Sequence, residues 1–171
     1  VKRDYAKLLL VTQPSAFSCL HVIDGARAEL TAQERLDVQR LASFSDANLI
    51  DPSGAQAVPP SEIFGDEPSH DWCYFYQQMD LARQRKDWES AAQFADEAIA
   101  LGYQPYEVSE WLPALEAYIH VGDQKMAKRI ALLIRVDKKT YQSICQRLKP
   151  LTGTPAEYDR DLLAESLCKH D

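Results

Sequence analysis

Residues 70–92 read HDWCYFYQQMDLARQRKDWESAA, and this stretch decides the fold. Four aromatic residues fall within five positions: Trp72, Tyr74, Phe75 and Tyr76. On a helix, Trp72 shares a face with Phe75 and Tyr76, because residues three or four apart are neighbours. Met79 continues that face one turn later. The pattern predicts a helix face that is buried in a core. The alternative is a surface on which a sugar stacks, and it requires the same rings to be exposed.

Other residues of this stretch fall outside the predicted apolar face. We interpret His70 and Asp71 as a helix-start pair rather than as a general base. Cys73, between the aromatic residues, is interpreted as a small packing residue. Tyr74, and Tyr106 further along the chain, are expected to be more exposed than the rings of the apolar face.

Start and stop signals predict helices from residue 70 to the end of the chain. The expected helices cover 70–85, 88–101, 110–121, 124–136 and 138–148, and a sixth begins at Thr154-Pro155-Ala156-Glu157. The expected N-caps are Asp87, Ser109, Asp123 and Asp137, because such side chains accept hydrogen bonds from free backbone N–H groups. Gly102 and Gly122 are the expected stops, and Pro113 is tolerated in the first turn of its helix.

The helical region repeats internally with an offset of 36 residues. This offset places Phe75 on Trp111, Ala91 on Ala127, Ala95 on Ala131 and Ala98 on Ile134. Each copy is a helix, a short turn that ends in Asp, and a second helix with small residues on one face. A stripe of small residues lets the partner helix approach closely. The pattern therefore predicts two consecutive helical hairpins.

The second copy resembles a tetratricopeptide repeat (TPR). The residues at that family's W, G/A, Y, G and A positions are Trp111, Leu115, Tyr118, Gly122 and Ala127. The first copy departs from the pattern, with Met79 in place of a small residue, Ala82 in place of an aromatic one, and no glycine before Asp87. The resemblance implies a mainly α fold of two degenerate TPR-like hairpins, with C-terminal helices that cap the stack.

The first fifty residues predict a small α/β appendage. KLLLVTQ (7–13) and CLHVID (19–24) are expected to form two short strands. Thr31 and Glu34 form a capping box that predicts a helix over 31–44. Leu36, Leu41 and Phe44 repeat at roughly helical spacing within it. The expected divisions are 1–50 for this appendage, 51–69 for a Pro-rich linker or draped loop, 70–136 for the two hairpins and 137–171 for the capping helices.

Charge is unevenly distributed along the chain, whose net charge is −7. Residues 51–123 contain fourteen acidic and three basic residues, whereas residues 124–149 contain one acidic and eight basic residues. A basic block can indicate nucleic-acid binding, but an acidic chain repels phosphate at long range. We expect the cations of residues 124–149 to lie on the solvated face of a helix pair: Lys125, Lys128, Arg129, Arg135, Lys138 and Lys139. We expect no nucleic-acid partner.

The sequence assigns no catalytic, cofactor-binding or metal-ligating residue. It contains neither a glycine-rich phosphate loop nor a G-x-S-x-G motif. The acidic pairs Asp66-Glu67 and Asp96-Glu97 are adjacent in sequence, so a helix would place the two members on different faces. Such pairs do not form an acid–base dyad.

Four cysteines are scattered along the chain, at positions 19, 73, 145 and 168. Cys19 and Cys168 each stand two residues before a histidine, His21 and His170, but zinc usually requires four ligands with longer spacers. We therefore expect no metal site. Cys73 and Cys145 have apolar surroundings, which are typical of buried free thiols. Disulfides are the alternative, with no readable connectivity, and the redox compartment stays open.

Several unusual strings carry a second resemblance: SCLHVIDG, LASFSDANLI, DWCYFY with DLARQRKDW, and SEWLPALEAY. They are similar to the C-terminal soluble region of large polytopic membrane proteins of cyanobacteria and chloroflexi, which are glycosyltransferase-like or functionally uncharacterised. The resemblance covers residues 8–135. Since Val1 is not an initiator methionine, we expect the chain to be part of a longer protein. The resemblance implies that transmembrane segments and any catalytic part lie upstream, and no catalytic motif carries over to a residue here.

The expected function is a non-catalytic helical-repeat interaction domain. Its expected partner is another protein or the transmembrane region of its own chain. The alternative is an accessory domain that binds a glycan or a lipid head group, and an independent enzyme is a third hypothesis. The domain is expected to be soluble and attached to a membrane. Lys2, Arg3 and Lys7 favour the cytoplasmic side, but the side is left open.

Overall fold

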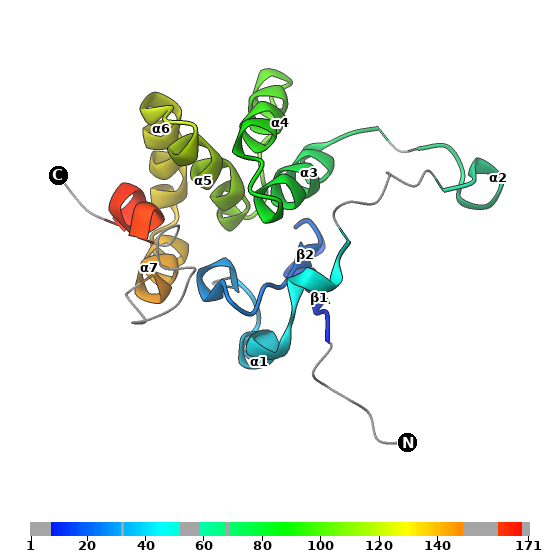
Figure 1. Cartoon of the computed structure of the whole chain (residues 1–171), viewed down its shortest axis with the longest axis horizontal. Helices are drawn as coiled ribbons and strands as arrows, with labels where there is room; N and C mark the ends of the chain where they lie inside the picture. The colour runs from blue at the N-terminus through cyan, green and yellow to red at the C-terminus, as the bar shows by residue number, and fades with distance from the viewer. Residues whose placement is uncertain (1–7, 32, 52–58, 68, 149–160, 169–171) are drawn as a thin grey trace.

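The computed structural model describes residues 8–31, 33–51, 59–67, 69–148 and 161–168 (Figure 1). These residues are mainly helical and include a two-stranded antiparallel sheet, which confirms the predicted fold class in this form. The main helices are α3 (Trp72–Gln84), α4 (Trp88–Ala100), α5 (Leu112–His120), α6 (Gln124–Val136) and α7 (Lys138–Arg147). The two strands and α1 (Leu36–Leu41) lie below α3 and α5 in Figure 1.

Two helical hairpins follow each other with the predicted offset of 36 residues. The 3₁₀ turn η4 (Val108–Trp111) and α5 together cover 108–120, which is 36 residues after α3. Helix α6 begins and ends 36 residues after α4. The predicted caps are confirmed at Asp87, which accepts from the backbone N–H of Ser90, and at Asp123, which accepts from that of Met126. Asp137 caps α7 in the same way.

The start of the second hairpin differs from the prediction. Ser109 does not cap a helix: the chain enters through the turn η4, and no partner for Ser109 Oγ is found among the described residues. Ser109, Glu110 and Trp111 are all buried, so this entry is packed into the core instead of being exposed to water. Pro113 lies in the first turn of α5, as predicted.

The turns inside the two hairpins have the same backbone path. Gly122 has φ +79°, and Lys86, at the equivalent position, has φ +57°. The N–H of Asp87 donates to the carbonyl of Ala82 at 2.9 Å, and that of Asp123 donates to the carbonyl of Tyr118 at 2.9 Å. The first hairpin therefore adopts the left-handed turn without glycine, a conformation that is unfavourable for lysine.

The core lies between the two helices of each hairpin and between the hairpins. Ala91, Ala95 and Ala98 on α4 are fully buried, as the predicted small-residue stripe requires. The rings of Trp72 and Trp111 meet edge to face with centroids 4.6 Å apart, which joins the first hairpin to the second.

The N-terminal strands are confirmed but short. Strand β1 (Val11–Thr12) pairs antiparallel with β2 (His21–Val22), with Val11 opposite Val22 and Thr12 opposite His21. This pairing places His21 and Thr12 on the same side of the ribbon, because directly opposed residues share a face.

The predicted helix over 31–44 forms only in part, over residues 36–44, and it is not one continuous α-helix. The chain forms the turn η1 (Ala28–Thr31), then α1, then the turns η2 (Ala42–Phe44) and η3 (Ala47–Leu49). The capping box does not form because the Glu34 carboxylate binds the side chains of His21 and Thr12 instead. Three apolar side chains of the expected helix are consequently exposed: Leu36, Leu41 and Phe44.

The described part of the linker contains one helical turn, α2 (Ser61–Phe64), which the sequence did not predict. It lies away from the other helices at the right of Figure 1. Residues 52–58 and the expected helix start at Thr154 lie outside the described residues. The described end of the chain contains the helical turn η5 (Ala164–Cys168), which contacts α6 and α7.

All four cysteines form disulfides, so the prediction of free buried thiols is wrong. Cys19 pairs with Cys73 and Cys145 pairs with Cys168. The first bond joins the N-terminal segment to the start of α3, and the second joins α7 to η5. Among the described helices, none combines the length and the apolar character needed to cross a bilayer.

Candidate functional site

The N-terminal segment (residues 8–51) packs on a face formed by α3, η4–α5 and α7, which we term the inner face. Side-chain links join the two from the start of α3 to the end of α7: Cys19 to Cys73, His21 to Glu110, Arg27 to Glu116, Gln33 to Thr140, and Thr31 and Gln39 to Arg147. The ring of His21 also lies 5.3 Å from that of Tyr76 on α3. The segment therefore crosses the inner face from the first hairpin to α7.

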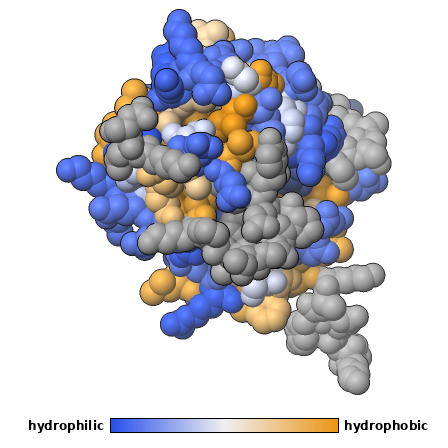
Figure 2. Space-filling model, turned by 60° about the vertical axis from the view of Figure 1, so that its left-hand side comes forward, coloured by the Kyte–Doolittle hydropathy of each residue, from blue (hydrophilic) through white to orange (hydrophobic). Residues whose placement is uncertain are grey.

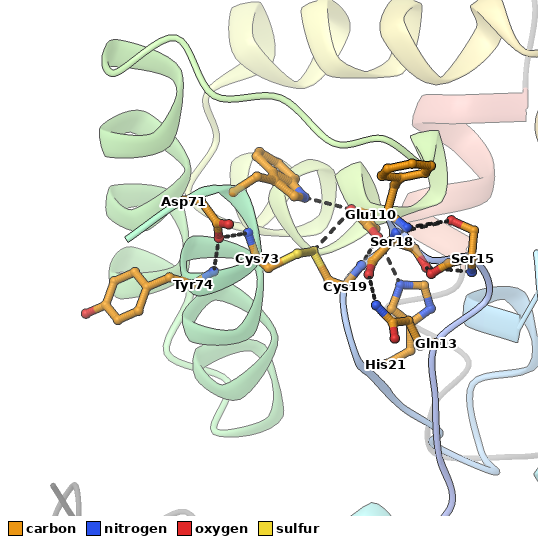
Figure 3. The surroundings of a disulfide bond; sticks show 11 residues. Gln13, Ser15, Ser18, Cys19, His21, Asp71, Cys73, Tyr74 and Glu110 are labelled. Carbon is orange, nitrogen blue, oxygen red and sulfur yellow. Dashed lines mark hydrogen bonds and ion pairs between the residues drawn. A yellow bond between two sulfur atoms is a disulfide. The ribbon is translucent and has the colours of Figure 1, made fainter. Parts of the chain in front are cut away.

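Glu110 is the centre of a buried polar cluster on this face (Figure 3). Its Oε1 accepts the backbone N–H of Cys19 at 2.8 Å and lies 3.2 Å from Nε2 of His21. Its Oε2 accepts the indole N–H of Trp72 at 2.8 Å. One carboxylate thus joins the N-terminal segment, the start of α3 and the entry to the second hairpin.

His21 is held between two carboxylates. Its Nε2 faces Glu110 and its Nδ1 lies 3.0 Å from Oε1 of Glu34, whose other oxygen accepts the hydroxyl of Thr12 at 3.0 Å. Burial disfavours the charged ring, but hydrogen bonds and charge attraction from Glu110 and Glu34 outweigh it and raise the pKa of His21 to about 9. His21 is therefore a buried cation at neutral pH, and both ring nitrogens donate hydrogen bonds.

Arg27 forms the second charged contact with the inner face. Its Nη1 and Nη2 donate to the two oxygens of Glu116 at 3.0 and 2.9 Å, in the bidentate geometry that suits a guanidinium. Its Nε donates to Glu29 of the same segment. Burial disfavours the charged guanidinium, but Glu116 and Glu29 more than offset this and hold the pKa of Arg27 above its usual value. Arg27, Glu29 and Glu116 are all buried.

The first hairpin carries a comparable pair within a single helix. Asp80 lies 36 residues before Glu116, at the equivalent position. Its Oδ1 accepts from Nε of Arg83 at 2.8 Å, and its Oδ2 accepts from Gln84 at 3.2 Å. This buried carboxylate is therefore neutralised by a cation three residues further along α3, without a contribution from the N-terminal segment.

Helix α7 provides the last contacts of the inner face. Gln33 donates to the hydroxyl of Thr140, and Arg147 donates to Thr31 and Gln39. These links are polar and only partly buried, in contrast to the charged clusters on η4 and α5.

The disulfide between Cys19 and Cys73 fixes the segment to the first hairpin (Figure 3). Cys73 is in the first turn of α3, where its backbone N–H donates to Asp71 at 3.0 Å. Asp71 also accepts from the N–H of Tyr74, so the predicted helix-start role of Asp71 is confirmed. The covalent link and the cap hold the segment beside the Glu110 cluster.

The aromatic residues of residues 70–92 are placed largely as predicted. Trp72, Phe75 and Tyr76 are buried with Met79, and Trp111 is buried as well, so these rings offer no surface for a sugar. Tyr74 is half-buried and stacks on His70, with ring centroids 3.5 Å apart.

The cysteine and histidine pairs noted in the sequence have other partners. Cys19 is in a disulfide and His21 lies between carboxylates, whereas His170 is outside the described residues. Within the described residues, no group of three His, Cys, Asp or Glu side chains is placed to hold a metal ion.

Sequence reasoning missed the charged residues of the interface: His21, Arg27, Glu34, Glu110 and Glu116. One signal was present for the two glutamates of the second hairpin. They stand in the apolar run SEWLPALEAY, where every residue from Ser109 to Tyr118 is buried, so neither has a solvent-facing position. A carboxylate in such a helix requires a buried partner.

No protein-family model, curated protein or solved structure matches this chain.

Proposed function

We propose that the chain is a TPR-like docking domain whose inner face holds its own N-terminal segment. One observation carries the proposal: two buried glutamates of the second hairpin, Glu110 and Glu116, bind the cations His21 and Arg27 of that segment. A buried carboxylate that loses its cation destabilises the fold strongly. The hairpins and the segment therefore depend on each other, as a repeat surface and its ligand do, although both belong to one chain.

We further propose that this domain is the extramembrane C-terminal part of a larger glycosyltransferase-like membrane protein. The support is the resemblance of strings such as SCLHVIDG and SEWLPALEAY. Both strings contribute to the docked interface, through Cys19 and His21 in the first and Glu110 and Glu116 in the second. In that setting, docking holds the incoming chain in a fixed position on the hairpins, and the domain itself performs no catalysis.

The pairing of all four cysteines supports an oxidising, extracytoplasmic location for the domain. This location differs from the cytoplasmic side that the N-terminal Lys and Arg residues favoured. Mass spectrometry without reduction tests it on protein isolated from its native membrane fraction. The expected masses correspond to a 19–73 and a 145–168 crosslinked peptide, and four free thiols would contradict the location.

Hydrogen exchange tests the docking itself. In Arg27→Met, a guanidinium is replaced by an apolar side chain of similar reach, which leaves Glu116 without its bidentate partner. We expect the largest gain in exchange in peptides from residues 20–35, and a smaller gain in α4 and α6 that follows the loss of global stability. Arg35→Met is the matched control, since Arg35 forms an exposed pair with Asp37. A gain in exchange that is as large in α4 and α6 as in residues 20–35 would show a single cooperative unit and would contradict a docked segment.

Glycan binding is the second candidate function. It would use two exposed rings elsewhere on the chain, because Trp72, Phe75 and Tyr76 are buried. Phe17 and Tyr106 are 71% and 64% exposed, and their ring centroids are 5.1 Å apart. Exposed paired rings can stack on a sugar. A glycan array with the wild-type chain and with Phe17→Ala/Tyr106→Ala tests this role. A sugar signal that disappears in the variant supports it, and equal signals for both proteins exclude this pair of rings.

A further inference from the structure

Helix α6 presents an exposed face that combines cations with aliphatic side chains. Lys125, Arg129, Leu132 and Val136 follow one another at spacings of four, three and four residues, so they form one stripe along the helix. Leu132 is 61% exposed and Val136 is 80% exposed. Lys128 is exposed at the edge of the stripe. Figure 2 brings the α6–α7 side of Figure 1 forward and shows hydrophobic patches among hydrophilic side chains.

The positive charge continues beyond the end of α6. Lys138 and Lys139, at the start of α7, are exposed. Asp137 is the one acidic residue between 124 and 149. Its carboxylate caps α7 and accepts the backbone N–H groups of Lys139 and Thr140 at 3.0 and 3.1 Å. Within residues 124–149, Asp137 is therefore the one carboxylate that offsets the positive charge of α6 and the start of α7.

The equivalent face of α4 has the opposite character. The residues 36 positions before the stripe are Glu89, Gln93, Asp96 and Ala100. Both helices bury the equivalent positions 91 and 127, 95 and 131, and 98 and 134, so the packing of the hairpins does not require the combination of cations and exposed aliphatic side chains on α6.

We propose that this face of α6 lies against an anionic phospholipid surface. The chain as a whole is acidic, but salt screens that charge beyond about one Debye length, so lysine and arginine side chains gathered on one face attract lipid phosphates at short range. Adjacent aliphatic side chains enter the boundary between head groups and acyl chains. The proposal extends the proposed placement at a membrane to a direct contact. The acidic face of α4 in a second copy of the chain is a less suitable partner for the cations of α6. Its carboxylates already have hydrogen-bond donors, since Asp96 accepts the hydroxyl of Tyr118 and Glu97 accepts from Gln93. One helix face on each side also gives a small interface.

Vesicle co-sedimentation of the purified chain tests the proposal. Vesicles of phosphatidylglycerol and phosphatidylcholine in equal parts are compared with vesicles of phosphatidylcholine alone, at low and high salt. We expect binding to the anionic vesicles only, weakened by salt. Lys125→Glu/Arg129→Glu is expected to lower the partition coefficient by about tenfold or more, because two surface cations are reversed. Leu132→Ser/Val136→Ser is expected to lower it about fivefold and to keep the salt dependence.

Arg35→Glu/Arg40→Glu is the matched control, because it reverses two exposed cations on the N-terminal segment. It should bind anionic vesicles nearly as well as the wild type. Equal binding to both kinds of vesicle, or equal loss in the control, overturns the proposal. Self-association without lipid that Lys125→Glu/Arg129→Glu abolishes also overturns it and assigns the face to a second copy. The docking of the N-terminal segment is tested without lipid, so a negative vesicle result leaves that proposal standing.

Discussion

The two hairpins have the same length and spacing and the same aspartate cap on their second helices, but they neutralise a buried carboxylate in different ways. In the first, Asp80 binds Arg83 of its own helix at 2.8 Å. In the second, the equivalent residue Glu116 has Ile119 three residues later, and its bidentate partner Arg27 comes from the N-terminal segment. One hairpin therefore supplies the hydrogen-bonded cation for its own carboxylate, whereas the other obtains that hydrogen-bonded cation from a distant part of the chain. Two repeats with equivalent helices can therefore differ in whether each one neutralises its own buried carboxylate.

Removal of the two cations should show this difference most clearly. Arg27→Met is expected to destabilise the fold by about 3–5 kcal/mol, the usual effect of an unpaired buried charge. Arg83→Met should cost less, about 2 kcal/mol, because the Asp80 side chain is 11% exposed and keeps its bond from Gln84, whereas that of Glu116 is 1% exposed. Urea unfolding monitored by circular dichroism gives both values. An equal decrease in the free energy of unfolding in both variants would contradict a difference between the hairpins in how they neutralise a buried carboxylate.

The second hairpin should also carry a pH dependence that the first one lacks. The pKa of His21 is about 9 in the folded chain, whereas an unperturbed histidine has a pKa of 6.5. The charged form is thus favoured by folding, so its contribution is complete below pH 6.5 and is lost as pH rises to 9. The difference corresponds to about 3 kcal/mol.

The measurement is the free energy of unfolding at several pH values between 6 and 10. His21→Gln should flatten the decrease over this window, because the side chain no longer titrates. His70→Gln is the matched control, since it makes the same substitution at an exposed histidine and keeps the buried contacts of His21. A wild-type curve that is flat from pH 6.5 to 9 would contradict a buried, charged His21.

The smallest effects are expected at the turns of the hairpins. Lys86 adopts φ +57° where Gly122 adopts φ +79°. Lys86→Gly should therefore stabilise the fold by up to about 1 kcal/mol, and Gly122→Ala should destabilise it by about 1 kcal/mol. Thermal unfolding of both variants checks the opposite signs. A change of the same sign in both would show that the two turns are not equivalent.

Local signals predicted the hairpins well. The caps Asp87, Asp123 and Asp137 each lie directly before the helix that they start, and Gly122 follows the end of α5. The spacing of Trp72, Phe75 and Tyr76 alone indicates a buried helix face. These features depend on residues within one or two turns of each other. A single sequence is sufficient to read interactions at that range.

Long-range contacts were not predictable in the same way. Glu34 looked like part of a capping box with Thr31, but its carboxylate binds His21, thirteen residues earlier in the chain. The pairing of Cys19 with Cys73 and the contact of Arg27 with Glu116 span 54 and 89 residues. Each results from the path of the folded chain, which the spacing of residues does not determine.

The disulfides also bear on how the chain is made. They join the first cysteine to the second and the third to the fourth, and 72 residues separate Cys73 from Cys145. At a synthesis rate of about 5–20 residues per second, Cys19 and Cys73 have several seconds together before another thiol emerges. The order of emergence therefore favours the native pairs, because each cysteine is paired with its nearest neighbour along the chain among the four.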